Sequence, residues 1–245
     1  MSSAAPWLVA RDLVAGYLPG IDIVRGVSIE AWRGQIRCVL GPNGTGKSTL
    51  LKVLFGFLPP RDGEIRLDGQ RLRSVDPHEM GRHGVVYLPQ RPSIFPYLSV
   101  DVNLRLGAWR YRGERGRVDE LVSRACEQFP MLRDRRRQSA GTLSGGQQRQ
   151  LEIARSLMHD PALLLIDEPT AGVEPRVAAV IYETIKSLAA QGKAVLLVDQ
   201  NIKRALEIAD YIYVMRTGTM LSEASRQVFG GDVEALVSRW LYASG

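Results

Sequence analysis

Cysteine is nearly missing from this chain, which has two among 245 residues, Cys38 and Cys126. Two cysteines cannot build a disulfide framework or a four-cysteine zinc site, so a reducing, cytosolic compartment fits best. Long apolar runs are missing as well: the longest covers about six residues, Val53 to Leu58, and Gly56 interrupts it. A membrane-spanning helix needs about 20 apolar residues, so we expect no segment that crosses a bilayer. The first residues also lack a basic start followed by an apolar run, so we expect no secretion signal.

Lysine is scarce, with 5 residues against 27 arginines, a skew that we interpret as genome composition. The net charge is +6, and its excess lies mainly in residues 61–137, which hold 16 basic and 11 acidic side chains. Such a segment could face nucleic acid or an anionic membrane, and a solvated arginine-rich surface would explain it equally well. Hydrophobic residues make up 45% of the chain, enough for the core of one large domain or of one domain with a small inserted lobe.

The apolar patterns predict alternating strands and helices, and hence a parallel sheet covered on both faces. The expected strands are 7–15, 21–29, 36–40, 64–67, 85–88, 163–166 and 194–198. A helix should begin at Gly46 or Lys47 and be stopped by Pro59-Pro60. Residues 91–158 are polar, arginine-rich and mostly helical in pattern. A later helix is expected to bury one face, made of Val177, Val180, Ile181, Ile185 and Leu188.

Residues 41–49 match the phosphate-binding loop pattern G-x-x-x-x-G-K-[ST], between an apolar strand and a helix. Glycines let backbone amides converge on phosphate oxygens at the helix N-terminus. We expect Lys47 to reach the β- and γ-phosphates and the Ser48 hydroxyl to ligate Mg²⁺. The nucleotide-binding residues predicted in this loop are Gly41, Pro42, Asn43, Gly44, Thr45, Gly46, Lys47, Ser48 and Thr49.

Four apolar residues, 163–166, are followed by two acids, Asp167 and Glu168. A buried strand that ends in a carboxylate suits a Mg²⁺ site beside a phosphate loop. Asp167 would hold the metal, directly or through water, and Glu168 would polarise the attacking water. Many ordinary strands end in an acid, so this assignment depends on the loop found upstream.

Residues 142–150 predict a second anion-binding helix start. Ser144 can cap the helix, and Gly145 and Gly146 leave backbone amides open. Each glycine costs about 1 kcal/mol inside a helix, a cost that an ordinary capped helix would avoid. Ser144, Gly145, Gly146 and Gln147 are therefore a candidate second anion-binding site.

The Leu-Ser-Gly-Gly-Gln sequence at 143–147 resembles the signature motif of the ATP-binding-cassette (ABC) ATPases, and the similarity covers essentially the whole chain. The resemblance implies an α/β fold of the P-loop NTPase (RecA-like) type, with a mostly parallel sheet core, an N-terminal antiparallel β subdomain and an inserted α-helical subdomain. It implies one ABC ATPase domain over 1–245. Within it we expect the β subdomain and nucleotide-binding core in 1–90 and 159–230, the helical subdomain in 91–158, and a C-terminal helix in 231–245.

The resemblance also implies roles for single residues. Tyr17 stands where the family stacks an aromatic ring on adenine. Gln90 stands at the glutamine-loop position, which touches Mg²⁺ and water, so it is a predicted catalytic and metal-binding residue beside Ser48 and Asp167. In the family, two subunits sandwich two ATP molecules, and the signature helix of one closes on the γ-phosphate held by the other. A second ABC ATPase subunit, in a homodimer or heterodimer, is therefore an expected partner.

Two positions depart from the family pattern. The loop after Glu168 usually ends in Asp, and here it ends in Glu174. The switch residue after strand 194–198 is usually His, and here it is Gln200, which can donate a hydrogen bond to a γ-phosphate oxygen but cannot carry a proton. Glu168 and Gln200 are predicted catalytic residues. The histidines, none of which we expect to be catalytic, are His78, His83 and His159.

Segments 91–108, 129–138 and 198–201 resemble bacterial uptake systems for branched-chain and other hydrophobic amino acids, which often carry Gln at the switch. The resemblance favours the shorter of their two ATPase subunits. It implies an ATP-hydrolysing, energy-coupling subunit that uses ATP and Mg²⁺ and lies peripherally on the cytoplasmic face of the inner membrane. Its partners would be transmembrane permease subunits and, indirectly, a periplasmic or extracellular solute-binding protein. Within residues 91–110, an aromatic and apolar cluster suggests a docking groove for a permease helix, with a local core as the alternative.

Other functions stay open. Close relatives of these systems take up urea and short amides, and a single sequence does not firmly exclude an exporter or a regulatory cassette. A soluble ABC ATPase acting on nucleic acid is disfavoured, because only about 95 residues separate Lys47 from the signature, too few for a long coiled coil. Translation-factor members carry two cassettes, and this chain has one. We therefore expect no nucleic-acid partner.

Overall fold

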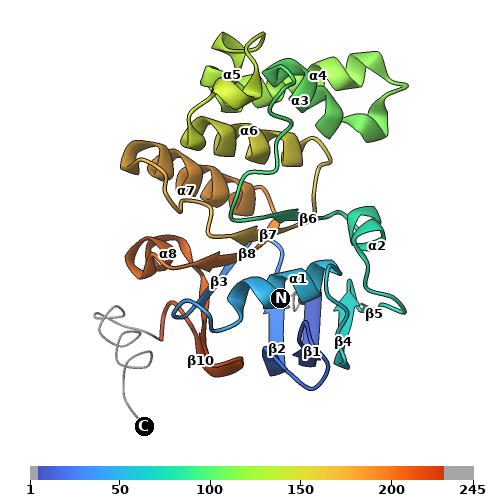
Figure 1. Ribbon diagram of the computed structural model, residues 1–245, viewed down its shortest axis with the longest axis vertical. Helices are drawn as coiled ribbons and strands as arrows, with labels where there is room; N and C mark the ends of the chain where they lie inside the picture. The colour runs from blue at the N-terminus through green and yellow to red at the C-terminus, as the bar shows by residue number, and fades with distance from the viewer. Residues whose placement is uncertain (1–4, 229–245) are drawn as a thin grey trace. The chain divides into compact units, whose positions relative to one another are not determined.

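The computed structural model describes residues 5–228, so the helix expected over 231–245 lies outside the described residues. The chain divides into two compact units. The first contains Ala162–Glu168 and the described parts of Met1–Tyr87 and Thr184–Gly245 (Figure 1). The second contains Leu88–Pro161 and Pro169–Glu183, so the chain passes between the units repeatedly.

The first unit is built around two sheets. The antiparallel sheet has the order β2-β1-β4-β5, from strands β1 (Leu8–Ala15), β2 (Val24–Ala31), β4 (Asp62–Leu67) and β5 (Gln70–Arg71). The second sheet has the order β10-β9-β3-β8-β7-β6, from strands β3 (Ile36–Leu40), β6 (Val85–Leu88), β7 (Leu163–Asp167), β8 (Ala194–Asp199), β9 (Tyr211–Arg216) and β10 (Thr219–Ser225). Its centre is parallel: β3 pairs with β8 and β9, and β7 pairs with β8. The predicted α/β fold with an N-terminal antiparallel sheet is confirmed.

The helices of the first unit are α1 (Lys47–Phe55), α2 (Pro77–Arg82) and α8 (Ile202–Ile208). Every residue of β3, β7 and β8 is buried, as expected for continuous apolar runs in a covered parallel sheet. Apolar side chains of α1 join side chains of both sheets in one hydrophobic core. Because β3, β7 and β8 are parallel, their carboxyl ends meet at one edge, which is where the predicted site residues follow them.

Helix α1 begins at Lys47 as predicted, but the expectation that Pro59-Pro60 stops it is wrong. It ends at Phe55, and Gly56 caps it in the left-handed conformation with φ 88°. A Cβ atom on Gly56 would lie 2.5 Å from the Cα of Asp76, so the position has no room for a side chain. A glycine cap therefore ends the helix before the prolines are reached.

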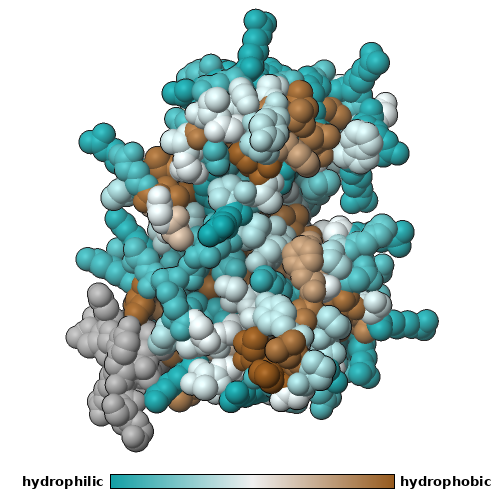
Figure 2. Space-filling view, in the orientation of Figure 1, coloured by the Kyte–Doolittle hydropathy of each residue, from teal (hydrophilic) through white to brown (hydrophobic). Residues whose placement is uncertain are grey.

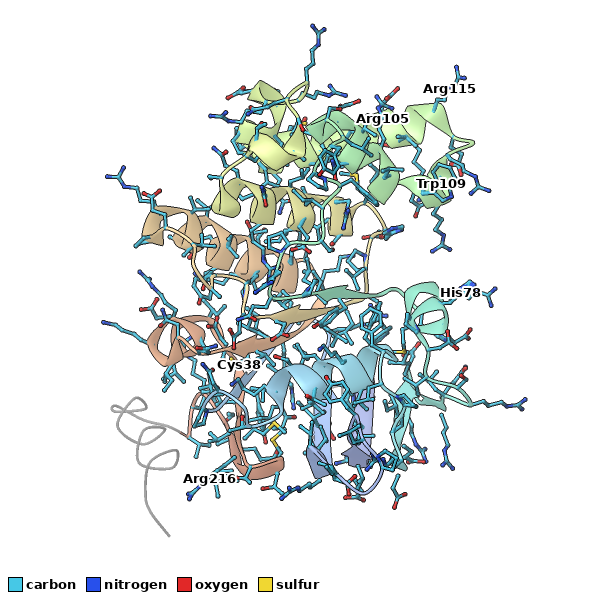
Figure 3. All side chains as sticks on the ribbon, in the orientation of Figure 1. Cys38, His78, Arg105, Trp109, Arg115 and Arg216 are labelled. Atoms are coloured by element: carbon cyan, nitrogen blue, oxygen red, sulfur yellow. The ribbon has the colours of Figure 1, made fainter. Side chains whose placement is uncertain are left out.

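The second unit is mainly helical. Its helices are α3 (Val100–Gly107), α4 (Arg115–Gln128), α5 (Pro130–Asp134), α6 (Gly145–Leu157) and the 3-10 helices η1 (Trp109–Tyr111) and η2 (Ala140–Thr142). Helix α3 packs on α6 and α4, and their buried side chains include Leu104, Val122 and Leu151. Figure 3 shows Trp109 and Arg115 on the outside of this unit, and Trp109 is 59% exposed.

Helix α7 (Pro175–Ala190) contributes residues to both units. Ile181, Ile185 and Leu188 are buried as predicted, but Val180 is 46% exposed. Val180 lies about 100° around the helix from Ile181, which puts it outside the buried stripe. The assignment of Val180 to the buried face was therefore wrong.

The described residues include no helix that is long and apolar enough to span a membrane. Hydrophilic side chains dominate the face seen in Figure 2, with hydrophobic residues in separate patches. Many arginines of residues 61–137 pair with nearby acids on the surface. Such pairs include Arg66–Glu64, Arg105–Asp101, Arg124–Glu120 and Arg136–Asp101. This favours the solvated-surface interpretation of the basic segment.

Candidate nucleotide-binding site

The phosphate loop joins β3 to α1 and depends on its glycines. A Cβ atom on Gly41 would lie 2.3 Å from the carbonyl oxygen of Met215, so β9 comes too close for any other residue. Gly46 has φ 102°, a left-handed conformation that glycine adopts without strain. It precedes α1 without a side-chain cap, so the positive end of the helix faces the loop. The loop has the features of an anion-binding site.

Lys47 is buried, with 4% of its surface exposed. Its Nζ donates hydrogen bonds to the carbonyl oxygens of Gly41, at 2.7 Å, and Pro42, at 2.9 Å. Burial lowers the pKa of Lys47, while the nearby carboxylates of Glu168 and Asp167 act in the opposite direction. The ammonium group is thus held across the loop, where it can meet phosphate oxygens.

Asp167 ends β7 and meets the phosphate loop. Its Oδ1 accepts a hydrogen bond from the Ser48 hydroxyl at 2.9 Å, and its Oδ2 accepts one from the Tyr87 hydroxyl at 3.3 Å. Burial raises the pKa of Asp167, and the charge of Glu168 adds to the rise, whereas the hydrogen bonds from Ser48 and Tyr87 oppose it. A hydroxyl and a carboxylate in contact are oxygen donors of the kind that Mg²⁺ takes in nucleotide sites.

Glu168 and Gln200 are in direct contact. The Gln200 amide Nε2 donates a hydrogen bond to Oε1 of Glu168. Glu168 is 6% exposed, has a left-handed backbone with φ 42°, and its amide donates to the carbonyl oxygen of Val198 at 2.8 Å. Sequence analysis predicted that Glu168 polarises the attacking water and that Gln200 can donate to a γ-phosphate oxygen, and it missed the contact between the two residues. Their positions after the neighbouring strands β7 and β8 were the available sign of it.

Tyr17 lies in the loop between β1 and β2. It is 53% exposed, and its hydroxyl accepts a hydrogen bond from Nζ of Lys52, on α1, at 3.3 Å. The Lys52 ammonium also lies 5.7 Å from the centre of the Tyr17 ring. An exposed ring beside the phosphate loop's helix can stack on a base.

The signature segment and Gln90 belong to the second unit. The Ser144 hydroxyl accepts a hydrogen bond from the Gln147 amide, and the Gln147 side chain accepts one from the Ser144 amide, which together form a capping box on α6. A Cβ atom on Gly146 would lie 2.9 Å from Val177, so packing requires that glycine. A Cβ atom on Gly145 would meet nothing within 4 Å. Packing therefore explains why residue 146 is glycine, but it does not explain why residue 145 is glycine.

The structure therefore brings together Lys47, Ser48, Asp167, Glu168 and Gln200 within the first unit. Gln90 follows β6, and residues 144–147 open α6, both within the second unit. Sequence analysis did not single out Tyr87 or Lys52, which contact site residues through their hydroxyl and ammonium groups. No motif identifies these two, because their role depends on the fold.

A family model described as ABC transporter matches residues 24–171 of the chain. The chain belongs to this family, and the match includes the phosphate loop, the signature segment and the acids after β7. Membership makes the protein an ABC ATPase that binds nucleotide, as the sequence resemblance implied.

Two curated relatives are similar over most of the chain. A probable branched-chain amino acid transport ATP-binding protein, LivF of Archaeoglobus fulgidus, is 39% identical over 92% of this chain and 92% of its own length. The high-affinity branched-chain amino acid transport ATP-binding protein BraG of Pseudomonas aeruginosa is 36% identical over 87% of this chain and 91% of its own length. Among solved structures, an ATP-binding subunit of an ABC transporter superposes with a TM-score of 0.83 at 26% identity, covering 96% of this chain and 99% of its own.

Proposed function

We propose that the protein is the energy-coupling ATPase subunit of an importer for branched-chain or other hydrophobic amino acids. The observation that carries the proposal is the likeness to two branched-chain amino acid transport subunits over nearly the full chain. In this proposal the subunit lies peripherally on the cytoplasmic face of the inner membrane. It binds transmembrane permeases and works indirectly with a periplasmic or extracellular solute-binding protein.

The first unit supplies the chemistry. Lys47 and backbone N–H groups of the loop's non-proline residues bind the phosphates, and Tyr17 stacks on adenine. Ser48 and Asp167 would hold Mg²⁺, which supplies charge neutralisation on the β- and γ-phosphates when bound. Gln90 stays a predicted further ligand of this ion. Glu168 orients the attacking water. Gln200 donates its amide hydrogen bond to Glu168 in this structure and to a γ-phosphate oxygen in the closed state.

The second unit supplies the signature segment, which in this proposal closes the nucleotide site of another subunit. Ser144, Gly145, Gly146 and Gln147 form a capped helix start whose first amides can meet the γ-phosphate held by the partner. Gly145 has open space where a Cβ would be, which suits close approach by a phosphate. The functional ATPase is then a dimer with two shared sites.

The nucleotide site is tested by Lys47→Ala. Lys47 is the side-chain cation of the phosphate loop, so ATP binding and hydrolysis should both fall at least about tenfold. ATP affinity by calorimetry and steady-state ATPase activity would be compared with wild type and with Lys203→Ala, a lysine exposed on α8. Equal activity of Lys47→Ala and wild type would refute the site assignment.

The solute is tested in membranes that contain the subunit with its permeases. Binding protein loaded with leucine or valine should stimulate ATP hydrolysis, while urea-loaded protein should not. Stimulation by urea instead would establish the importer of short amides, and stimulation of the isolated subunit by DNA or RNA would establish a nucleic-acid ATPase.

The permease contact is proposed on the exposed apolar side chains that follow Gln90. Tyr97 is 95% exposed, Trp109 59% and Phe95 48%. A local core would bury these rings, so their exposure supports a docking surface for a short permease helix. Cross-linking from Tyr97→Cys should reach a cytoplasmic permease segment, and a position on α2 such as His78→Cys serves as the control. Cross-links from His78→Cys alone would contradict this docking surface.

A further inference from the structure

Arg61 lies directly before β4, and its backbone amide donates to the carbonyl oxygen of Val14, near the end of β1, at 2.7 Å. Its guanidinium group reaches from there into the loop between β1 and β2. The side chain is 33% exposed, so it is partly shielded from water by the loop that it enters. This loop carries Tyr17, the residue proposed to stack on adenine.

The loop is a tight structure that turns its carbonyl groups toward one point. Leu18 and Ile21 form an antiparallel bridge, and Gly20 has a left-handed φ of 76° between them. A Cβ atom on Gly16 would lie 1.8 Å from the carbonyl oxygen of Ile21, so the two sides of the loop touch there. Several carbonyl oxygens are therefore close together and need hydrogen-bond donors.

Arg61 supplies those donors. One terminal nitrogen donates to the carbonyl oxygens of Gly16, at 3.2 Å, and of Leu18. The other donates to the carbonyl oxygen of Ile21, at 3.4 Å, and to the carboxylate of Asp22. The acceptors Gly16 and Leu18 are the two residues on either side of Tyr17. A planar guanidinium with several donors in fixed directions suits such a set of acceptors, and a lysine ammonium suits it less well.

We propose that Arg61 is a positioning residue that fixes the backbone on both sides of Tyr17 and so presents its ring to the adenine base. Holding the loop in advance removes the entropy cost of ordering it when the base arrives. The proposal rests on the proposed adenine contact of Tyr17. It assigns to Arg61 a share of the affinity for the base and none of the affinity for the phosphates.

The test compares ATP with inorganic tripolyphosphate, which has the phosphates and lacks the base. Calorimetry would measure both dissociation constants, with Mg²⁺, for wild type, Arg61→Ala, Arg61→Lys, Tyr17→Ala and the double variant Arg61→Ala/Tyr17→Ala. Arg66→Ala is the matched control, because Arg66 is on β4, the strand that follows Arg61, and pairs with Glu64 outside the loop. Base stacking on an aromatic ring is worth about 1–3 kcal/mol, so Tyr17→Ala should weaken ATP binding by about fivefold or more.

We expect Arg61→Ala to weaken ATP binding by about three- to tenfold, a part of that stacking contribution, with tripolyphosphate binding unchanged. Arg61→Lys should fall between wild type and Arg61→Ala, and Arg66→Ala should match wild type. The double variant should be no weaker than Tyr17→Ala, because without the ring there is nothing to position. Turnover at saturating ATP should change less than twofold for Arg61→Ala.

Three other outcomes would contradict either the role of Arg61 or the adenine contact of Tyr17. If Arg61→Ala weakens ATP and tripolyphosphate equally, or adds its full effect to Tyr17→Ala, Arg61 only stabilises the fold and the inference is overturned. If Tyr17→Ala weakens ATP alone and Arg61→Ala leaves ATP affinity unchanged, the inference fails while the adenine contact stands. If Tyr17→Ala itself leaves the preference for ATP unchanged, the proposed adenine contact fails. Should Arg61→Ala not fold, Arg61→Lys carries the same comparison.

Discussion

Gln200 differs from a histidine in ways that its contact with Glu168 makes testable. Its amide donates a hydrogen bond to Glu168, so it can fix the carboxylate that we propose orients the attacking water. A neutral amide stabilises transition-state charge less than a charged donor, and it does not titrate near neutral pH. In the proposed mechanism Gln200 therefore acts on both Glu168 and the γ-phosphate as a neutral hydrogen-bond donor.

Gln200→Ala should lower the turnover number by about tenfold or more, with a smaller change in ATP affinity, because one transition-state hydrogen bond and the support of Glu168 are lost. Gln200→His should stay active and gain a pH dependence between about 6 and 8. Steady-state ATPase measurements across that range on the three proteins check both results. Wild-type turnover in Gln200→Ala would show that Gln200 has no part in catalysis.

The burial of the Asp167 carboxylate lowers the stability of the fold. Burial raises its pKa, so the ionised carboxylate is less favourable in the folded protein than in the unfolded chain. When the pKa of a carboxyl group is higher in the folded than in the unfolded state, its protonated form stabilises the fold. This stabilisation is fully present below the unfolded pKa of about 3.9 and is lost as pH rises through the folded pKa. The ionised group therefore opposes folding at neutral pH.

Asp167→Asn should raise the melting temperature at pH 7 by about 2–4 °C for each kcal/mol relieved, while ATP hydrolysis is lost. The gain should shrink as pH falls through the raised folded-state pKa of Asp167 and vanish below about 3.9, where wild-type Asp167 is neutral in both the folded and the unfolded state. Thermal unfolding of both proteins across pH measures this. A lower melting temperature for Asp167→Asn at pH 7 would mean that the hydrogen bonds from Ser48 and Tyr87 outweigh the burial.

At the scale of elements, helix α6 contains a buried ion pair. The side chains of Arg149 and Glu152 are each 1% exposed and hydrogen-bonded to one another. Arg149 also donates to the carbonyl oxygens of Pro89 and Pro169, and Glu152 accepts from the amide of Ser93 at 2.7 Å. These contacts fix the segment on both sides of Gln90 to the helix that carries the signature.

Removing Glu152 takes away the carboxylate to which the buried Arg149 is hydrogen-bonded, and breaking a buried ion pair costs about 3–5 kcal/mol. Glu152→Ala should therefore lower the free energy of unfolding by about that amount in urea titrations. Arg124→Ala, which breaks the exposed pair with Glu120 on α4, should change it by less than about 1 kcal/mol. Comparable losses in the two variants would show that the buried pair contributes nothing beyond a surface pair.

The sequence predicted the elements better than their ends and contacts. Strands β3, β7 and β8 and the start of α1 followed from continuous apolar runs and the phosphate-loop pattern. The end of α1 did not, because a glycine cap depends on the close approach of Asp76. The network around Arg149 was also invisible, since its partners come from residues 89, 93 and 169 and meet only in the fold.

At the scale of the whole molecule, the chain has two helix starts, at α1 and α6 in different units, that we propose bind nucleotide. In the proposed dimer each ATP is held by α1 of one subunit and covered by α6 of the other. Glu168→Gln keeps the shape of the side chain and removes the base. The variant should still bind ATP and accumulate as a dimer with ATP and Mg²⁺.

Light scattering checks this dimer, with ADP and Mg²⁺ as the control in which it should dissociate. A Glu168→Gln protein that stays monomeric with ATP and hydrolyses at the wild-type rate would contradict both the assigned base and the shared site. The proposed nucleotide contact of residues 144–147 depends on this assembly, so the sequence could suggest it only through the family resemblance.

The burial of both cysteines has a practical consequence for labelling. Cys38, which Figure 3 labels, is 0% exposed and belongs to the first unit, and Cys126 is 6% exposed. Burial raises the pKa of both thiols, well above its usual value for Cys38, so neither forms the reactive thiolate readily. A single cysteine introduced on the surface would therefore react with maleimide dyes far faster than the native ones. Fluorescence and spin-label distance measurements can then use the native background directly, without first replacing a residue in the central strand β3.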